Sequence, residues 1–507
     1  MSGAAQELLG RRLFRSAAWI TVGNTSSRIL SLISAIIAAR LLSQPEFGTF
    51  GLIQSTLSTF GILATMSLGV AATRQLAIYR DQSRERVSIA AVTVLGLTVV
   101  LTIITCTLLI VLSHFLAQRT LKNEALEGLL RFSMLLLGAT AVSSVLTGML
   151  SGLEKFGLTA LMAGIQNVTT LIGCATLVRG YGLYGLIASY AAGFSVSVFC
   201  GLHFMREVLA RATLSSFRRH VREELVILSR FCVPKVVCGL LVMLAFSGAQ
   251  VLIARQHNGY QELAYFTAAD RFRQFIFFVT GFIGTALLPL LSNVAWSGKI
   301  ERTDRRAVEM GIRWTALLVV PLTTALAFSG PQLMAMFGHA YFANWSVLMP
   351  VLIWAGLSAI TGSASAALLA YDNISYFFWQ QVGYAAVSIV CVFRLKAFGA
   401  VGLAGSLCVA IAVTAMMNYW LSEKAGIYTS RAKRTYFESC FGVCAACVCS
   451  WIVKSQYKLL LAAPAIAVSI VISAKYWSDA SERNAVFSWV GLKARKLSSR
   501  QNLVTNG

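Results

Sequence analysis

Apolar segments long enough to cross a membrane recur along the whole of this 507-residue chain, and they decide its fold class. A hydrocarbon core of about 30 Å is crossed by roughly 20 apolar residues in an α-helix. Because lipid offers the backbone no hydrogen bonds, each crossing segment must satisfy its own polar groups. Only 12% of the residues are charged, against about 25% in soluble proteins. The sequence therefore predicts an all-α polytopic membrane protein.

Fourteen apolar segments qualify as spans, and the loops between them are too short to form an extramembrane domain. The predicted spans cover residues 16–41, 48–72, 88–114, 129–150, 157–178, 183–205, 230–254, 262–291, 311–336, 345–370, 374–394, 399–421, 438–454 and 458–475. The charged N-terminus resembles an export signal, but the apolar segment that follows is longer than the 7–15 residues of a signal-peptide core. We therefore expect residues 16–41 to form the first span.

An internal repeat organises the spans. The sequence YGLYGLIAS at 181–189 returns as FGAVGLAGS at 398–406, displaced by 217 residues. A second set of matches is displaced by 215 residues: Ala39, Arg40, Phe50 and Phe60 correspond to Ala254, Arg255, Tyr265 and Phe275. Six spans separate the copies, and an even number gives both the same orientation. The repeat predicts two parallel six-helix lobes with the substrate path between them.

The repeat also sets the expected domain boundaries. We expect an N-lobe of six spans at 1–205 and a C-lobe of six spans at 230–421, joined by a basic amphipathic linker at 206–229 that lies along the cytoplasmic surface. The thirteenth and fourteenth spans, with the loop before them, occupy 422–475. A basic cytoplasmic tail occupies 476–507.

The basic residues are distributed according to membrane topology. A formal net charge of +23 on a soluble protein would suggest nucleic acid. Here, however, the N-terminus, the tail and the loops after even-numbered spans hold 26 of the 43 lysines and arginines, while the loops after odd-numbered spans and their margins hold eight. Cytoplasmic loops carry such an excess. We therefore predict that both termini are cytoplasmic, and we expect no nucleic-acid partner.

Charged residues deep inside spans give the strongest chemical signal. Arg28 lies twelve residues into the first span, and Arg271 and Arg273 lie near the middle of the eighth. A charge at that depth costs several kcal/mol by insertion scales, so it normally faces a partner or a wet cavity. Asp270 is the one acidic residue that lies well inside a predicted span. One carboxylate cannot neutralise three arginines, so the middle of the membrane keeps a net positive charge. We expect a central cationic cavity that binds an anion.

Further candidates surround these charges. Lys235, in the seventh span, is either an additional ligand or a side chain that snorkels to the inner surface. The repeat counterparts of the eighth-span charges include Gln54 and Ser55, whose polar groups either bind sugar or pack helices. Asp270 and Arg273, three residues apart on one helix, could instead neutralise each other. If Asp270 titrates, it is the candidate residue for coupling to a proton or sodium gradient.

Other residue classes point away from catalysis. The eleven cysteines lie in apolar segments, and the five histidines lie at span ends or in loops, so we expect neither a metal site nor a cofactor. No nucleotide-binding or hydrolase signature stands in a suitable context. The sequence predicts a transporter rather than an enzyme.

A resemblance to a known family covers about residues 10–421. The segment RILSLISAIIAARLLSQPEFGTFGLIQSTLSTFGILATMSLGVAATRQLA at 28–77 resembles the opening of bacterial polysaccharide transporters, the Wzx-type O-antigen and exopolysaccharide flippases of the MOP superfamily. The second half is similar to the same family in FCVPKVVCGLL, AYFTAADRF, ALLPLLSN and MFGHAYFANWSVLMPVLIWAG, which begin at residues 231, 264, 286 and 336. The resemblance places Arg28, Arg271 and Arg273 in a cationic central cavity.

The resemblance also implies a function. It implies an inner-membrane flippase that moves an undecaprenyl-pyrophosphate-linked oligosaccharide to the periplasmic leaflet by alternating access. Its implied partners are the lipid-linked oligosaccharide, membrane lipids, and the polysaccharide polymerase and chain-length machinery. Three alternatives stay open: a flippase for the lipid-linked peptidoglycan precursor, a MATE-type drug or ion antiporter, and a membrane polysaccharide polymerase or ligase. A cation exporter would favour an acidic cavity, and a polymerase would favour a large outer loop.

Overall fold

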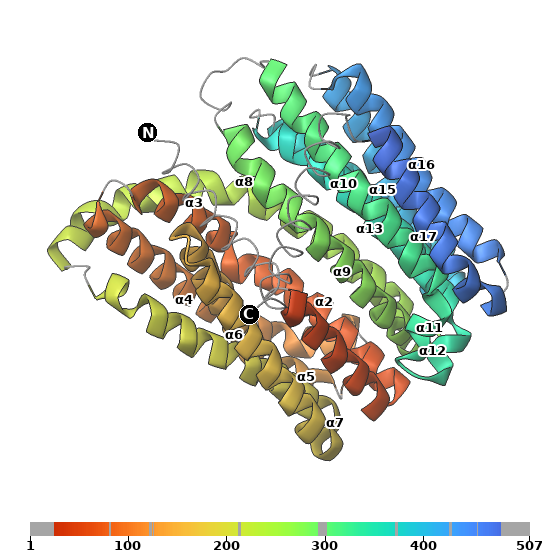
Figure 1. The fold of residues 1–507 in the computed structure, drawn as a ribbon. Coiled ribbons are helices and arrows are strands. Elements are labelled where there is room, and N and C mark those ends of the chain that lie inside the picture. The colour runs from red at the N-terminus through yellow and green to blue at the C-terminus, as the bar shows by residue number, and fades with distance from the viewer. Residues whose placement is uncertain are drawn as a thin grey trace, which may run out of the picture. The chain divides into compact units, whose positions relative to one another are not determined.

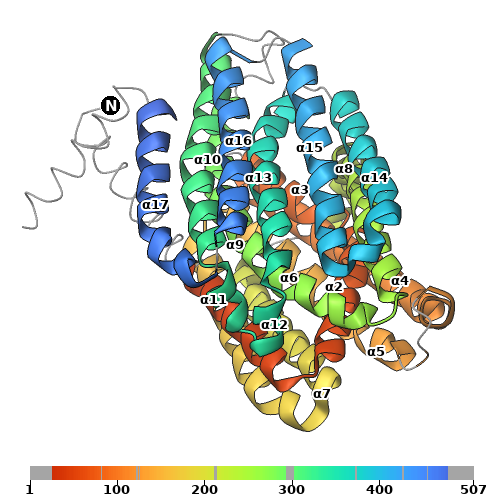
Figure 2. The ribbon, with the colours of Figure 1, turned by 90° about the vertical axis from the view of Figure 1, so that its right-hand side faces the viewer.

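The computed structural model describes the chain in nine stretches and is helical throughout them. The described residues are 25–80, 83–120, 124, 126–210, 214–292, 302–370, 374–424, 428–453 and 455–477. Within these residues the elements are helices joined by short turns, as Figures 1 and 2 show. The all-α fold class predicted from the sequence is confirmed. The tail at 476–507 lies outside the described residues from position 478 onward.

The first half of the chain forms a helix over residues 25–41 and seven labelled helices. These are α2 (Gln44–Thr65), α3 (Leu68–Arg80), α4 (Arg84–Phe115), α5 (Leu126–Phe132), α6 (Met134–Gly152), α7 (Phe156–Leu209) and α8 (Leu214–Ala254), with a π-helical turn at Leu116–Thr120. From Leu214 the predicted linker is helical and continues into α8.

The second half follows the same style. Its helices are α9 (Gly259–Ser292), α10 (Arg302–Phe328), α11 (Gly330–Ala335), α12 (His339–Ala343), α13 (Leu348–Ala370), α14 (Ile374–Leu395), α15 (Gly399–Lys424), α16 (Ser430–Ile452) and α17 (Ser455–Trp477). Short 3₁₀ turns at Trp345–Val347 and Lys396–Phe398 precede α13 and α15.

Nine helical segments among the described residues are long and apolar enough to cross a membrane. Two of them each hold two predicted spans: Phe156–Leu209 contains spans five and six, and Tyr376–Lys424 contains spans eleven and twelve. The total of fourteen stays a prediction, since residues 16–24 of the first span lie outside the described part of the chain.

The predicted second span, 48–72, lies within the apolar segment Gln44–Arg80, and a break divides that segment into α2 and α3. The backbone leaves the helical region at Met66 and Ser67, whose φ angles are +42° and +58°. The Met66 N–H donates to the carbonyl of Ile62 and closes α2, and α3 begins at Leu68. A left-handed residue after a helix satisfies an end carbonyl, so the break is a helix cap inside an apolar run.

The repeated sequence motif corresponds to a repeated backbone conformation. Gly182, between the two halves of α7, has φ 53° and ψ −127°. Gly399, at the start of α15, has φ 59° and ψ −131°. Side chains with a Cβ rarely adopt this region, so glycine is required at both turns. Each turn folds a helix back on its predecessor: a Cβ on Gly185 would lie 2.3 Å from the Leu177 carbonyl oxygen, and one on Gly402 would lie 2.0 Å from that of Leu395.

The chain divides into two compact units. The first comprises residues 1–271, 334–347 and 378–410, and the second comprises 272–333, 348–377 and 411–507. In the first unit, α3, α4 and α6 enclose a core of small and aliphatic side chains. Its fully buried members include Leu76, Ala90, Val94, Val145, Leu146 and Met149.

The second unit is a bundle built around α10. Helices α13, α16 and α17 contact α10, and Figures 1 and 2 show these four helices side by side. A close approach fixes α13 against α16, because a Cβ on Gly356 would lie 2.6 Å from the Val443 side chain. Such small residues let membrane helices approach closely. In the same unit, the Ser450 hydroxyl donates to the Ala327 carbonyl at 2.7 Å and ties α16 to α10.

Candidate functional site

The site begins with the close contact of α2 and α9 in the first unit. A Cβ on Gly48 would lie 1.8 Å from the Tyr260 carbonyl oxygen, and one on Gly51 would lie 2.0 Å from the Thr267 hydroxyl. Glycines three residues apart therefore let the two backbones run together over two turns. One turn further along, the next residue of the same α2 face is Gln54.

Gln54 meets Arg271 at that point. The Arg271 guanidinium donates from Nη2 to the Gln54 Oε1 at 2.8 Å, and its side chain is only 7% exposed. Its Nε has no hydrogen-bond partner among the described residues. The guanidinium has five donors in a planar fork. The hydrogen bond to Gln54 therefore leaves N–H groups of Arg271 that can donate hydrogen bonds to an anion.

Two further polar side chains lie near Arg271. The guanidinium interacts electrostatically with the Cys174 thiol and the Tyr190 phenol, which come from the two halves of α7. The Tyr190 hydroxyl is buried without a hydrogen-bond partner among the described residues, and its ring packs on Phe50 with centroids 5.3 Å apart. Sequence reasoning missed both residues, because a tyrosine and a cysteine in apolar helices carry no signal of polarity there.

Arg273 lies in different surroundings, in the second unit. Its guanidinium is 4.3 Å from the centre of the Trp354 ring and 5.2 Å from that of Phe277. Two helical residues are separated by about 200° around the axis. Arg271 and Arg273 therefore leave α9 on nearly opposite faces, so the structure does not place these two arginines on one helix face.

The other predicted cations are found on two other helices. Arg28 is exposed on the helix over residues 25–41. Its neighbour Ser27 anchors that helix to α7, donating to the Ala163 carbonyl and accepting from the Asn167 amide. Lys235 is half-buried on α8 and interacts electrostatically with Arg74.

Ser55 and Asp270 complete the predicted set. The Ser55 hydroxyl donates to the Leu52 carbonyl of its own helix at 2.9 Å, and the Ser55 carbonyl accepts from the Ser247 hydroxyl at 3.0 Å. The second of these contacts packs α2 on α8. Asp270 is half-buried in α9, directly before Arg271. Among the residues predicted as ligands, Arg271 and Gln54 are joined by a hydrogen bond.

Metal chemistry finds no support in the part of the chain that the structure describes. No group of three or more histidine, cysteine or acidic side chains there is placed to hold a metal ion. What the arrangement offers is a buried arginine with a neutral amide partner in a helical membrane protein, which suits the binding of an anionic group.

Two bacterial polysaccharide transport proteins are similar to this chain over most of its length. The chain is 24% identical over 398 residues to "EPS I polysaccharide export inner membrane protein EpsE" of Ralstonia solanacearum, covering 76% of this chain and 86% of that protein. It is 23% identical over 421 residues to "Succinoglycan biosynthesis transport protein ExoT" of Rhizobium meliloti (strain 1021), covering 81% of this chain and 80% of that protein.

Solved structures share the fold. The structure "Lipid II flippase MurJ, inward closed conformation" matches 90% of this chain and 98% of that chain with a TM-score of 0.67 at 16% identity. An inward-facing multidrug resistance MATE family transporter of the MOP superfamily matches 81% of this chain and 96% of that chain with a TM-score of 0.63 at 15% identity.

The family assignment comes from the sequence. Residues 13–295, more than half of the chain, match the family described as "Polysaccharide biosynthesis protein". This stretch contains the whole of α2 through α8, both repeat counterparts α2 and α9, and the Arg271–Gln54 contact. The chain is a membrane protein with a MATE-like and MurJ-like fold, and it belongs to the polysaccharide biosynthesis protein family.

Proposed function

We propose that this chain is a flippase that moves an undecaprenyl-pyrophosphate-linked oligosaccharide from the cytoplasmic to the periplasmic leaflet of the bacterial inner membrane, for O-antigen, capsule or exopolysaccharide synthesis. The observation that carries the proposal is the buried Arg271 guanidinium, held by Gln54 with donors left over, in a member of this family. The annotated relatives, a polysaccharide export protein and a succinoglycan transport protein, support the same cargo class.

The physical task explains why arginine is suited to the site. Sugar hydroxyls and a pyrophosphate lose their water if they enter hydrocarbon, and each unpaired polar group then costs several kcal/mol. A wet cationic cavity removes that barrier while the prenyl tail stays in lipid. Arginine forms paired, charge-assisted hydrogen bonds with phosphate oxygens. In this proposal Arg271 binds the pyrophosphate, and Arg28, Arg273 and Lys235 add positive charge along its path.

The proposal includes the lobes and the topology. The N-lobe at 1–205 and the C-lobe at 230–421 would alternate between inward-open and outward-open states, with the N-terminus and the tail both cytoplasmic. Reporter fusions after residues 220 and 430 should then behave as cytoplasmic, and fusions near residue 122 as periplasmic. A periplasmic signal at 430 would contradict the fourteen-span topology.

Contacts between loops support this topology, because loops predicted on the same side of the membrane contact one another. Predicted outer segments meet each other, as where Glu262 accepts from the Ala400 N–H at 2.7 Å and Arg255 donates to the Arg119 carbonyl. Predicted inner segments also meet each other, as in the 2.7 Å ion pair of Arg80 with Glu154. These contacts group the loops by end and leave the choice of cytoplasmic end to the charge distribution.

Deletion of the gene is the decisive experiment. We expect the lipid-linked repeat unit to accumulate in the inner leaflet, with loss of the surface polysaccharide. A polymerase mutant would instead accumulate single repeat units in the outer leaflet. Surface protection of the saccharide from periodate or lectin in intact spheroplasts distinguishes the two leaflets, and a strain carrying the gene on a plasmid is the control.

One second candidate deserves a test because of a specific match. The fold is shared with a lipid II flippase over 98% of that protein. If this chain moved the peptidoglycan precursor, its depletion would block cell-wall growth and lyse cells. The polysaccharide proposal predicts normal growth after deletion, provided that the lipid carrier is not trapped; blocking the first sugar transferase of the pathway removes that complication.

A further inference from the structure

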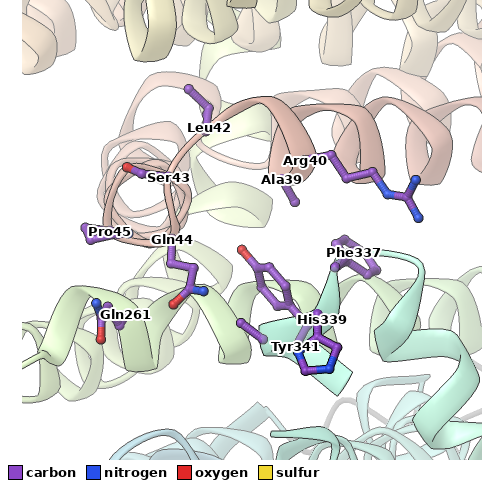
Figure 3. Close-up of a pocket in the computed structure, with 12 residues that line it drawn as sticks. Ala39, Arg40, Leu42, Ser43, Gln44, Pro45, Gln261, Phe337, His339 and Tyr341 are labelled. Carbon is purple, nitrogen blue, oxygen red and sulfur yellow. The ribbon is translucent and has the colours of Figure 1, made fainter. Parts of the chain in front are cut away.

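A pocket of about 520 Å³ lies at one end of the first unit, away from the middle of α9 (Figure 3). Its walls come from residues 39–45, from Gln261 near the start of α9, and from residues 337–341 in and before α12. All of these residues belong to the same compact unit. They lie in or next to the predicted loops after spans one, seven and nine. Loops after odd-numbered spans are periplasmic in the topology proposed above, so the pocket would open to the periplasm.

Aromatic rings surround Tyr341, which forms one wall of this pocket. Its ring lies edge-on to Tyr265 and Phe47, with centroids 5.6 and 6.3 Å apart, and beside Phe337 at 5.9 Å. The side chain is only 2% exposed. Aromatic contacts on several sides fix the ring orientation before any ligand arrives. Preorganisation of this kind lowers the entropic cost of binding.

The Tyr341 hydroxyl, in contrast, lacks a hydrogen-bond partner in the part of the chain that the structure describes. It is buried and makes no hydrogen bond to any described residue. Figure 3 shows it directed between Gln44 and Ala39, toward the interior of the pocket. Burial raises the pKa of this phenol well above its usual value, so the hydroxyl keeps its proton and can donate. A buried donor without an acceptor is unfavourable, and a ligand oxygen in the pocket would satisfy it.

The remaining polar groups indicate what kind of ligand fits. Gln44, Gln261 and Ser43 line the pocket, and amide and hydroxyl side chains both donate and accept hydrogen bonds. None of the described lining residues is a carboxylate, which argues against a cation. The fixed charge, Arg40, donates from Nε to the Met336 carbonyl at 2.8 Å. An inorganic anion needs donors alone, whereas a sugar presents hydroxyls that need both donors and acceptors.

The volume also suits a saccharide. Ligand pockets are commonly about 300–1,000 Å³ and combine apolar and aromatic walls with a few oriented polar groups. The Tyr265 hydroxyl donates a hydrogen bond to the Gln44 Oε1 at 3.1 Å, which fixes the orientation of that amide. A ring of polar groups around an aromatic wall matches a sugar, which has both hydroxyls and apolar C–H faces.

We propose that this pocket binds a sugar residue of the translocated saccharide at the periplasmic end of the protein, with Tyr341 and Gln261 as hydrogen-bonding ligands. The inference rests on the proposed flippase function and deepens it. Arg271 addresses the pyrophosphate that is common to such lipids, and the pocket addresses the saccharide that differs among them. The pocket therefore contributes to the choice of cargo and not to the binding of the pyrophosphate.

Binding of soluble saccharide tests the pocket. The probe is the set of oligosaccharides released by partial acid hydrolysis of the polysaccharide that the host exports, purified free of lipid and phosphate. Full-length protein in nanodiscs should bind them in saturation-transfer NMR and titration calorimetry. We expect Tyr341→Phe and Gln261→Ala each to weaken the Kd by about 3- to 10-fold, the effect of one lost hydrogen bond.

Tyr341→Phe keeps the ring cluster and removes a single oxygen. The matched control is Tyr181→Phe, because Tyr181 is 71% exposed and does not line the pocket; its Kd should equal that of the wild type. Equal affinity in wild type, Tyr341→Phe and Gln261→Ala would overturn the pocket assignment. So would absence of binding to the wild-type protein in a host whose deletion strain accumulates the lipid-linked unit. If the deletion strain accumulates nothing, the flippase proposal itself fails and the pocket assignment falls with it.

Discussion

The repeat counterparts α2 and α9 show where the two halves agree and where they differ. Both helices begin with a glutamate near a glycine of positive φ: Glu262 accepts from the N–H after Gly399, and Glu46 Oε1 lies 3.6 Å from the position of a Cβ on Gly182. About two turns further along, α2 carries the neutral Gln54 where α9 carries charges. The helix ends are repeated because they build the fold, and the proposed function gives a reason for the difference in the middles, where Arg271 would bind the cargo.

The largest expected effect follows from removing the charge that distinguishes α9. Arg271→Ala should reduce surface polysaccharide by about 10- to 100-fold, because a hydrogen bond to a charged group contributes about 1.5–3 kcal/mol. Arg271→Lys should retain part of the activity, since a point charge replaces a planar fork. Polysaccharide per cell and membrane protein abundance are the two measurements.

Arg434→Ala is the matched control for this prediction. Arg434 is 72% exposed on α16 and pairs with Glu438, so its loss should leave polysaccharide unchanged. Normal polysaccharide from the Arg271→Ala strain at normal protein abundance would remove the cationic site. Gln54→Leu should give a smaller loss than Arg271→Ala, because the guanidinium then loses its amide partner and keeps its charge.

The next effect concerns Asp270, which has no acidic counterpart in α2. If Asp270 couples transport to a proton or sodium gradient, Asp270→Asn mimics the protonated form and should transport without regard to the gradient. Uptake of lipid-linked saccharide by inverted vesicles, with and without an imposed gradient, measures this. Glu207→Gln, at an exposed position at the end of α7, should behave as the wild type.

A stable Asp270→Asn protein that still responds to the gradient would exclude the coupling role. Loss of the protein from the membrane would indicate instead that Asp270 holds α9 together with a neighbouring arginine. Protein abundance and gradient response therefore separate the functional and the structural interpretation.

Much of this comparison could be predicted from the sequence, because it depends on local patterns. The sequence predicts span five to end at residue 178 and span six to begin at residue 183, and the structure has a turn at Gly182 between them. The depth of Arg271 follows from counting residues into an apolar segment. The repeat offset led to Gln54 as a counterpart of the charges, and the structure joins it directly to Arg271.

Other features depend on contacts that the sequence does not encode locally. The break at Met66 and Ser67 contains neither glycine nor proline, so nothing in the apolar run marks it. The faces of Arg271 and Arg273 follow from helix geometry, but their partners Gln54 and Trp354 are distant in sequence. The pocket around Tyr341 is assembled from residues 39–45, Gln261 and residues 337–341, which no single sequence window contains.

The repeated turns give a smaller effect, on stability. A Cβ on Gly399 would lie 2.4 Å from Glu262 Oε2, and one on Gly182 would lie 3.6 Å from Glu46 Oε1. Both substitutions to alanine impose a strained backbone that costs about 1–3 kcal/mol, and Gly399→Ala adds a clash. We expect a lower thermal unfolding temperature for Gly399→Ala than for Gly182→Ala in detergent.

Gly164→Ala is the control, since a Cβ at Gly164 meets no atom within 4 Å. It should be neutral or stabilising by up to about 1 kcal/mol, as for other glycines inside helices. If Gly182→Ala and Gly399→Ala unfold at the same temperature as this control, the two turns do not need glycine and the structural repeat has no energetic meaning.

The smallest effect is expected at Arg273, and it sharpens the contrast within α9 itself. The guanidinium lies over Trp354, and such a cation–π contact contributes about 0.5–2 kcal/mol. Because the Arg273 guanidinium already interacts with the Trp354 ring, we expect it to contribute less to cargo binding than Arg271. Arg273→Ala should therefore reduce polysaccharide only about 2- to 5-fold, less than Arg271→Ala. Trp354→Leu should give a similar loss, and the double variant should lose little more than either single one, as expected for two residues that act through one contact. If Arg273→Ala instead abolishes polysaccharide while Trp354→Leu has no effect, Arg273 binds the cargo directly and does not act through its contact with Trp354.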